Sequence, residues 1–253
     1  MNDDLIPTVR NWIRAAERIA VLTGAGISTD SGIPDFRGPQ GVWTKNPAAE
    51  KMATLQHYVA DPEVRKRAWQ SRLDTFARRV EPNAGHRALV EIERRGALHA
   101  LITQNVDGLH QAAGSAPEKV IEIHGTIREV VCLDCGERAP MERALARVRA
   151  GEADPPCRSC GGILKSATIS FGQALVQEDL LRAELAARAC DLMLAVGTTL
   201  SVYPIAGVVP LAKRAGARVV IVNAEPTEMD DIADAVLRGS ISAILPRLVA
   251  ADA

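Results

Sequence analysis

Residues 19–38 read IAVLTGAGISTDSGIPDFRG and join an apolar run to a turn of small residues. The run 19–23 predicts a buried strand that leads directly into Gly24, Ala25 and Gly26. Small residues at a strand end let backbone N–H groups approach a phosphate, and a following helix adds its dipole. A lone G-x-G is a weak signal, because Thr29 stands where the longer dinucleotide fingerprint has its third glycine. A simple tight turn fits the same letters.

Outward from this stretch, short apolar runs alternate with segments of helical spacing. The strands are expected at 98–103, 120–123, 167–170, 192–196 and 218–222, and the helices at 5–18, 85–95, 177–189, 204–215 and 241–250. Strands of nearly continuous Val, Ile and Leu are typical of sheets buried on both faces. The pattern predicts an α/β fold with an open, doubly wound parallel sheet, into which the cysteine-bearing segment at about 130–163 is inserted.

The composition excludes several classes of protein. The 253 residues are 47% hydrophobic and 24% charged, which supplies enough apolar surface to exclude disorder as the main state. A net charge of -1 gives no global attraction to nucleic acid or to an anionic membrane. No run is long enough for a membrane helix, and the charged start MNDDLIPTVRNWIRAAER lacks the apolar core of a signal peptide. We therefore expect a cytoplasmic protein.

Four of the five cysteines form two C-x-x-C pairs, Cys132/Cys135 and Cys157/Cys160. Two such knuckles present four thiolates to one ion, and tetrahedral sulfur coordination suits one structural zinc ion. A redox motif is the alternative for either pair alone, but the doubled spacing argues against it. Four sulfur ligands leave no open position, so we expect no catalytic role for the metal. Cys190 is expected to be a buried core thiol.

Polar residues cluster just after the predicted strands. Gln104, Asn105 and Asp107 follow the strand at 98–103, where α/β folds place ligand-binding groups. Each alone is more often a loop cap, and together they favour a site. His124 closes a short strand before Gly125, and it is either a satisfied structural residue or a general base. His86 and His110 are expected to be structural.

The combination of motifs resembles the sirtuin family of NAD-dependent protein deacylases, in its bacterial form. The segments that carry the resemblance are GAGISTDSGIPDFRG at 24–38, TQNVDGLH at 103–110, HG at 124–125, the four cysteines, FG at 171–172, GTTLSVYP at 197–204 and VNAE at 222–225. They follow the family's order and cover nearly the whole chain. The resemblance implies NAD as co-substrate and one structural zinc ion. The implied reaction moves the acyl group of an acyl-lysine protein to ADP-ribose and releases nicotinamide.

The resemblance also implies a division of the chain. Residues 1–38, 81–128 and 165–253 would form the Rossmann-like NAD-binding domain. The helical insertion 39–80 and the zinc module 129–164 would form the small domain. An acyl-lysine peptide would add a strand between residues 169–175 and 200–204. Neither nucleic acid nor a membrane is an expected partner, and the family resemblance favours a monomer.

Individual roles follow from the matched motifs. His124 would be the general base, and Asn105 would order ribose and water. The NAD-binding residues would be Gly24, Ala25, Gly26, Ile33, Asp35, Phe36, Arg37, Gln104, Asn105, Val106, Asp107, Gly197, Thr198, Thr199, Asn223, Ala224, Glu225 and Ile241. The substrate contacts would be Ile169, Phe171, Gly172, Val202, Trp69 and Arg72.

Some positions depart from the family pattern. Lys165-Ser166 replaces the common Arg-Pro, and Gln173 replaces the Glu that usually follows Phe-Gly. Trp69-x-x-Arg72 stands where members that remove acidic acyl groups have Tyr-x-x-Arg. We expect deacetylation as the default activity and desuccinylation as the second. A module that binds NAD without turnover, and ADP-ribosyl transfer to protein, are the competing hypotheses.

Overall fold

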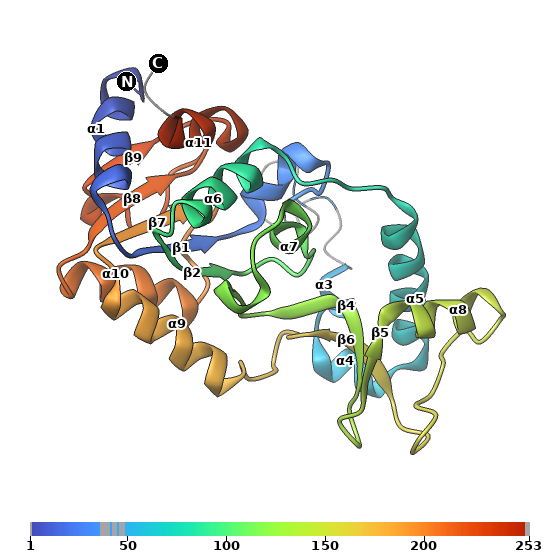
Figure 1. Ribbon diagram of the computed structural model, residues 1–253. Coiled ribbons are helices and arrows are strands. Elements are labelled where there is room, and N and C mark those ends of the chain that lie inside the picture. Colours follow the sequence, from blue (N-terminus) through green and yellow to red (C-terminus); the bar gives the residue numbers. More distant parts are fainter. Residues whose placement is uncertain (1, 36–40, 42–44, 46–48, 251–253) are drawn as a thin grey trace.

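The computed structural model describes residues 2–35, 41, 45 and 49–250. Its larger part is a six-stranded parallel sheet with the order β3-β2-β1-β7-β8-β9 (Figure 1). The strands are β1 (Ile19–Thr23), β2 (Leu98–Thr103), β3 (Val120–Glu122), β7 (Leu192–Val196), β8 (Arg218–Val222) and β9 (Ala235–Leu237). β1 and β7 are neighbours in the middle, so the direction of winding reverses between them.

Helices cover both faces of this sheet, which explains why the strands are apolar throughout. One face packs under α1 (Asn2–Ala15), α6 (Ala84–Arg94) and α11 (Ile241–Val249), and the other under α9 (Gln177–Ala189) and α10 (Val208–Arg214) (Figure 1). Side chains such as Val21 and Leu194 belong to the first core, while Leu22 and Met193 belong to the second. The predicted doubly wound fold is confirmed.

A smaller antiparallel sheet lies beside the parallel sheet and has its own helices packed against it. Its order is β5-β4-β6, from β5 (Arg138–Pro140), β4 (Gly125–Cys132) and β6 (Leu164–Thr168). α5 (Pro62–Ala77) and α8 (Met141–Arg149) pack against it, and Trp69 and Leu145 lie in their common core. Two shorter helices, α3 (Ala49–Met52) and α4 (Leu55–Ala60), precede α5 and lie beside this part in Figure 1.

Several predicted elements differ from the structure in their bounds. The strand expected at 167–170 lies at Leu164–Thr168, because β6 is fixed by antiparallel pairing with β4. The helix expected at 204–215 divides into a 3₁₀ turn, Ile205–Gly207, and α10. β4, α8, β9 and the short α7 (Leu109–Ala113) were not predicted from the sequence. Among the described residues, no helix is both long enough and apolar enough to cross a membrane.

Candidate active site

Two glycine loops meet where β1 and β7 end, at the point where the sheet changes its winding direction. Gly24 N–H donates to Val196 O at 3.0 Å, and Gly26 N–H donates to Gly197 O at 2.9 Å. A Cβ on Gly26 would lie 2.8 Å from the Gly197 Cα, and one on Gly197 would lie 2.4 Å from Ile27 N. Glycine is therefore required for the two backbones to approach this closely. The crevice at such a switch point is the usual place for a nucleotide in this fold.

The loop after β2 is tied to both glycine loops. Gln104 N–H donates to Thr23 O at 2.9 Å, and the Gln104 side-chain amide donates to Thr198 Oγ1 at 3.0 Å. Asn105 is buried, and its Nδ2 donates to Gly24 O at 3.1 Å and to Ser28 Oγ at 3.2 Å. These bonds fix the amide of Asn105 at the mouth of the crevice.

Ser28 links Asn105 to the carboxylate of Asp107. Its hydroxyl donates to Asp107 Oδ2 at 2.8 Å, and the other oxygen accepts from Leu109 N–H at 2.9 Å. Ser28 lies within the quoted motif, but no role was predicted for it from the sequence. Its partner Asp107 lies 79 positions away, so no local pattern connects the two residues. The one signal for Ser28 in the sequence is the segment GAGIS, which places a hydroxyl in the first turn after the glycines.

His124 lies between β3 and β4, beside the same crevice. Its Nδ1 is 3.0 Å from Gln104 O, and since a carbonyl only accepts, Nδ1 carries the hydrogen. The lone pair on Nε2 is therefore available. Burial lowers the pKa of His124, and the hydrogen bond to Gln104 O opposes this effect. A neutral imidazole with a fixed tautomer is suited to act as a general base.

The loops after β7 and β8 bring the other predicted NAD-binding residues to the same edge of the sheet. Asn223 is buried and its Nδ2 donates to Glu225 O at 2.7 Å, while Ala224 and Glu225 are exposed. Thr199 Oγ1 lies 2.7 Å from Ser201 Oγ. Ile241, the first residue of α11, lies close to Gly197. A Cβ added at Gly197 would lie only 2.9 Å from Ile241 Cδ1.

The remaining predicted NAD contacts flank the 3₁₀ helix Ala25–Ser31 and the loop after β2. Ala25, Ile33, Asp35 and Val106 are half-buried, and Val106 O accepts from Ile127 N–H at 3.0 Å. Phe36 and Arg37 lie outside the described residues.

The segment after β6 leads from His124 to an open groove. Ile169 N–H donates to His124 O at 2.8 Å. Phe171 N–H donates to Ala53 O at 2.8 Å, and Phe171 O accepts from Leu55 N–H at 3.0 Å. The groove is lined by Thr54, Leu55, Gln56, Val59, Ala60, Phe171 and Gly172. Val202 is half-buried, on the loop that precedes α10.

Arg72 and Lys165 bring two positive charges together at the small sheet, and Arg72 is half-buried. Arg72 donates to Ser166 Oγ at 2.7 Å, and its guanidinium lies 5.3 Å from the Trp69 ring centroid. Trp69 itself is 0% exposed. Lys165 is also buried, and its Nζ donates to the carbonyls of Ser166 and Thr168. Burial, with a smaller contribution from the charge of Arg72, lowers the pKa of Lys165 to about 8. Within the described part of the chain, neither cation has a carboxylate within 4.0 Å.

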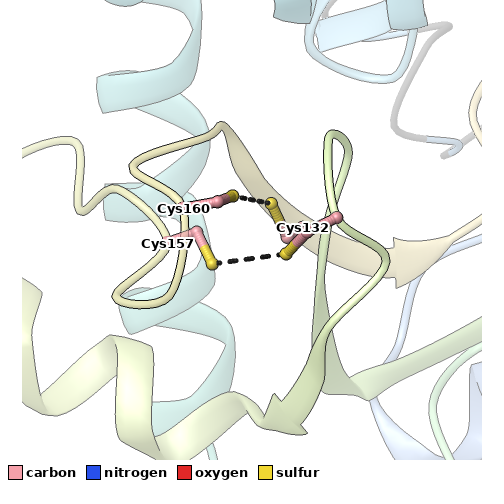
Figure 2. A group of neighbouring side chains, drawn as sticks. Cys132, Cys157 and Cys160 are labelled. Atoms are coloured by element: carbon pink, nitrogen blue, oxygen red, sulfur yellow. Dashed lines mark hydrogen bonds between the residues drawn. The ribbon is translucent and has the colours of Figure 1, made fainter.

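The four cysteines form a compact cluster at one end of the small sheet. Their sulfur atoms all lie within 4.8 Å of one another. Cys132 Sγ is 3.5 Å from Cys160 Sγ, and Cys135 Sγ is 3.8 Å from Cys157 Sγ. Figure 2 shows the sulfur atoms of Cys157 and Cys160 facing those of the opposite knuckle. Sulfur atoms bound at 2.3 Å to one tetrahedral zinc ion lie about 3.8 Å apart, so the donor set fits zinc.

Backbone geometry also prepares the knuckles for metal. Gly136 N–H donates to Cys132 O at 3.0 Å and Gly161 N–H donates to Cys157 O at 2.9 Å, both from left-handed glycines. Burial raises the pKa of Cys132, but hydrogen bonds from backbone N–H groups of Cys135 and Asp134 outweigh it and bring the pKa to about 7. At Cys160 the Gly162 backbone lowers the pKa, but the thiols of Cys135 and Cys132 outweigh it and raise the pKa to about 12, so without metal the cluster favours a thiolate at Cys132 alone of these two. A thiolate is the form that binds zinc.

Comparison with known proteins gives one consistent result. The Sir2 family profile matches residues 24–204. The NAD-dependent protein deacetylase 2 of Streptomyces coelicolor is 53% identical over 231 residues, which cover 91% of this chain and 96% of that protein. A solved structure of a Sir2 enzyme has a TM-score of 0.87 and 39% identity, and covers 98% of this chain and 97% of that one. Another, of a Sir2 protein with a deacetylated peptide and 3'-O-acetyl ADP ribose, has a TM-score of 0.86, 32% identity and 96% coverage of both chains.

Proposed function

This chain belongs to the Sir2 family and is an NAD-dependent protein deacetylase, and we propose that His124 and Asn105 carry its chemistry at the crevice between β1, β2 and β7. The acyl group passes to ADP-ribose and nicotinamide is released, in agreement with the acetyl ADP ribose bound by a related Sir2 protein. The observation that carries the assignment of the base is the bond between His124 Nδ1 and Gln104 O at 3.0 Å.

The glycine crevice is the proposed seat of NAD. NAD supplies a ribose carbon from which nicotinamide leaves as the acyl oxygen bonds to it. Gly24, Ala25 and Gly26 offer a cradle without large side chains to the pyrophosphate. Gln104 and Asp107 are proposed for the ribose and nicotinamide side. The adenosine side is assigned to Gly197, Thr198, Thr199, Asn223, Ala224, Glu225 and Ile241, with Ile33, Asp35 and Val106 completing the nicotinamide side.

His124 is proposed to take a proton from a ribose hydroxyl through Nε2. The positive charge that then develops on the ring is stabilised by the existing bond from Nδ1–H to Gln104 O. Asn105 Nδ2 donates to Gly24 O and to Ser28 Oγ. These two bonds fix the plane of the side-chain amide, and therefore the direction of its oxygen. This geometry supports the proposed ordering of ribose and water.

Acyl-lysine peptides are proposed to bind along the segment that follows β6. Ile169, Phe171 and Gly172 connect His124 to the groove, and Val202 would border the peptide on the other side. The proposed NAD-binding domain comprises 1–38, 81–128 and 165–253, and the small domain 39–80 and 129–164. β4 and β6 cross two of these boundaries, and they would connect the two domains.

The zinc ion is proposed to hold the two cysteine knuckles together. Four sulfur atoms occupy every tetrahedral position, so zinc takes no part in the chemical steps. Cysteines at metal spacing rather than disulfide spacing support the expected cytoplasmic location. A monomer is proposed from the family resemblance, and light scattering coupled to size exclusion tests it.

The role of His124 is tested by His124→Gln at saturating NAD and acetyl-lysine peptide. We expect the variant to keep its zinc and its melting temperature. Turnover should fall roughly 10²- to 10⁴-fold, the usual contribution of a positioned base. His57→Gln, an exposed histidine on α4, is the matched control and should keep wild-type turnover. Turnover of His124→Gln within twofold of wild type would exclude the assignment.

Removal of acidic acyl groups is a second candidate activity. Ser166 and Thr168 lie on one face of β6, and Thr168 pairs with Gly125, the residue after His124. Alternate residues of a strand are about 7 Å apart, so a short dicarboxylic acyl chain beside His124 would reach Arg72 and Lys165. A carboxylate there would supply a counter-charge to Arg72 and to the buried Lys165, neither of which forms an ion pair with any other residue that the structure describes.

An acyl panel on one peptide tests this second activity. Acetyl-, propionyl- and succinyl-lysine versions are compared on wild type, Arg72→Ala and Arg67→Ala, the last being an exposed arginine on the same helix. If Arg72 binds the distal carboxylate, its removal lowers only the succinyl rate. Equal losses for all three acyl groups would instead make Arg72 a packing residue of the small sheet.

A further inference from the structure

Two histidines are buried side by side behind the crevice. His86 lies in the first turn of α6 and His110 in α7, and they are 0% and 1% exposed. Their ring centroids are 5.0 Å apart and their planes meet at 57°. Neither ring takes part in the proposed reaction. Each ring nevertheless buries nitrogen atoms, whose hydrogen bonds must be accounted for.

The hydrogen bonds around His86 fix its tautomer. Asn83 caps α6 by accepting from Gly85 N–H at 2.9 Å, and the Asn83 backbone N–H donates in return to His86 Nδ1 at 3.4 Å. A nitrogen that accepts carries no hydrogen, so the proton of the neutral ring is on Nε2. That N–H is buried, and within the described residues it has no acceptor.

The tautomer of His110 follows from two threonines. Thr23 Oγ1 donates its hydrogen to Thr103 Oγ1 at 2.8 Å. Thr23 Oγ1 therefore accepts in its contact with His110 Nε2 at 2.9 Å, and the hydrogen of the neutral His110 ring is on Nε2. Nδ1 of His110 then keeps its lone pair, and no donor reaches it from any residue that the structure describes.

The two unsatisfied atoms are complementary, one donor and one acceptor on adjacent rings. We propose that His86 Nε2–H pairs with His110 Nδ1, either by a small ring rotation or through one enclosed water molecule, and that His110 is thereby a positioning residue for Asn105. Buried polar atoms without a partner destabilise a fold, and this pairing satisfies both. A polar enclosed space between two such atoms is also the kind that holds a water.

The pairing completes a chain in which every hydrogen bond points the same way. It runs from Asn83 N–H to His86, from His86 to His110, and then through Thr23 to Thr103. Thr103 Oγ1 also accepts from Asn105 N–H at 3.1 Å. Bonds aligned head to tail polarise one another as far as Thr103. Thr103 Oγ1 then accepts from Thr23 and from Asn105 N–H together, so the position that the chain gives this oxygen fixes the backbone of Asn105 at the ends of β1 and β2.

The chain requires both rings to be neutral, because a charged ring would direct two donors at each other. Burial lowers the pKa of His86 to about 4; Asp107 opposes this effect and Arg87 adds to it. Burial also lowers the pKa of His110 to about 3, with His86 adding to the effect. These directions agree with the tautomers that the hydrogen bonds dictate.

Nitrogen NMR of the zinc-loaded protein, labelled at the histidine rings, tests the tautomers without any activity measurement. We expect His86 and His110 to show the Nε2–H neutral form from pH 8 to pH 5, with single variants giving the assignments. A Nδ1–H tautomer at either residue, or a charged ring at pH 6, would overturn the proposal.

Kinetics test the positioning role, which rests on the proposed function of Asn105. His110→Gln keeps an N–H donor for Thr23, whereas His110→Leu does not. We expect His110→Leu to lower kcat roughly tenfold and His110→Gln to restore most of the loss, as one buried hydrogen bond implies. His99→Gln, on β2 away from the crevice, serves as the control and should keep wild-type kcat.

A double variant distinguishes positioning from general destabilisation. If His110 acts through Asn105, His110→Leu has no further effect on kcat once Asn105→Ala is present. Multiplying effects, or equal losses in the Gln and Leu variants, would overturn the positioning role. A wild-type kcat for Asn105→Ala would instead refute the proposed function of Asn105 and leave the NMR result standing.

Discussion

Replacing Gly26 by alanine tests the glycine crevice directly. The new Cβ would lie 2.8 Å from Gly197 Cα and 2.9 Å from Gly197 O, and neither is the flexible end of a side chain. Both distances fall below the 3.4–4 Å of ordinary contact, so the loops after β1 and β7 must separate by roughly half an ångström. That separation also stretches the bond from Gly26 N–H to Gly197 O, now 2.9 Å.

The expected magnitude follows from this overlap. Overpacking a rigid site costs about 1–3 kcal/mol of unfolding free energy. For a chain of this size each kcal/mol lowers the melting temperature by about 2–4 °C, so the total fall is about 2–12 °C. If NAD bridges the two loops, a similar strain opposes its binding, and KM for NAD rises roughly 5- to 150-fold. The proposed peptide site lies along the segment after β6 and not between these two loops, so KM for the peptide should stay within twofold of wild type.

The assay combines thermal unfolding with steady-state kinetics at varied NAD and at varied peptide. Gly207→Ala is the matched control, because a Cβ added at Gly207 would have no atom within 4 Å and the φ of this residue is -61°. Alanine at such a helical position should stabilise the protein by about 0.4–1 kcal/mol. A Gly26→Ala protein with wild-type melting temperature and KM for NAD would refute the account of the crevice.

Three further outcomes follow from the structure. Cys132→Ala should lose zinc, thermal stability and activity together, measured by metal analysis and unfolding; a fully active metal-free variant would exclude a structural requirement. Because burial lowers the pKa of His124, the acid limb of kcat/KM should lie below pH 6.5, and a limb above pH 7 would contradict its role. His86 and His110 bind protons more readily when unfolded, so stability is full above pH 6.5 and falls as pH drops toward about 4. Urea unfolding at pH 7 and pH 5 checks this, and equal stabilities would show that the rings are not held neutral.

Much of the larger sheet could be predicted from the sequence, because its strands are buried on both faces. β1, β2, β7 and β8 begin and end where the apolar runs do. The small sheet was less visible. β4 alternates half-buried and buried residues only from Glu129 to Cys132, because Arg128 is exposed, and so short a period of two does not predict a strand. α8 buries Met141, Ala144, Leu145 and Val148, a helical pattern that also lies inside the cysteine region.

For the site, the motifs supplied the residues but not their partners. Ser28 with Asp107 and Thr23 with Thr103 are pairs about 80 positions apart, which no local pattern connects. The orientation of the Arg72 side chain could not be predicted from the sequence either, because a helix residue in a charged segment is expected to face water. It turns inward because Ser166 offers an acceptor and Trp69 offers a ring face.

Transfer of the acetyl group from lysine to ADP-ribose is tested by analysing all products of a single reaction. The zinc-loaded chain is incubated with NAD and an acetyl-lysine peptide, and all products are quantified by mass spectrometry. We expect equimolar nicotinamide, deacetylated peptide and O-acetyl-ADP-ribose, with none of the three formed when NAD is omitted. Nicotinamide released without deacetylated peptide, with ADP-ribose attached to protein instead, would contradict this expectation.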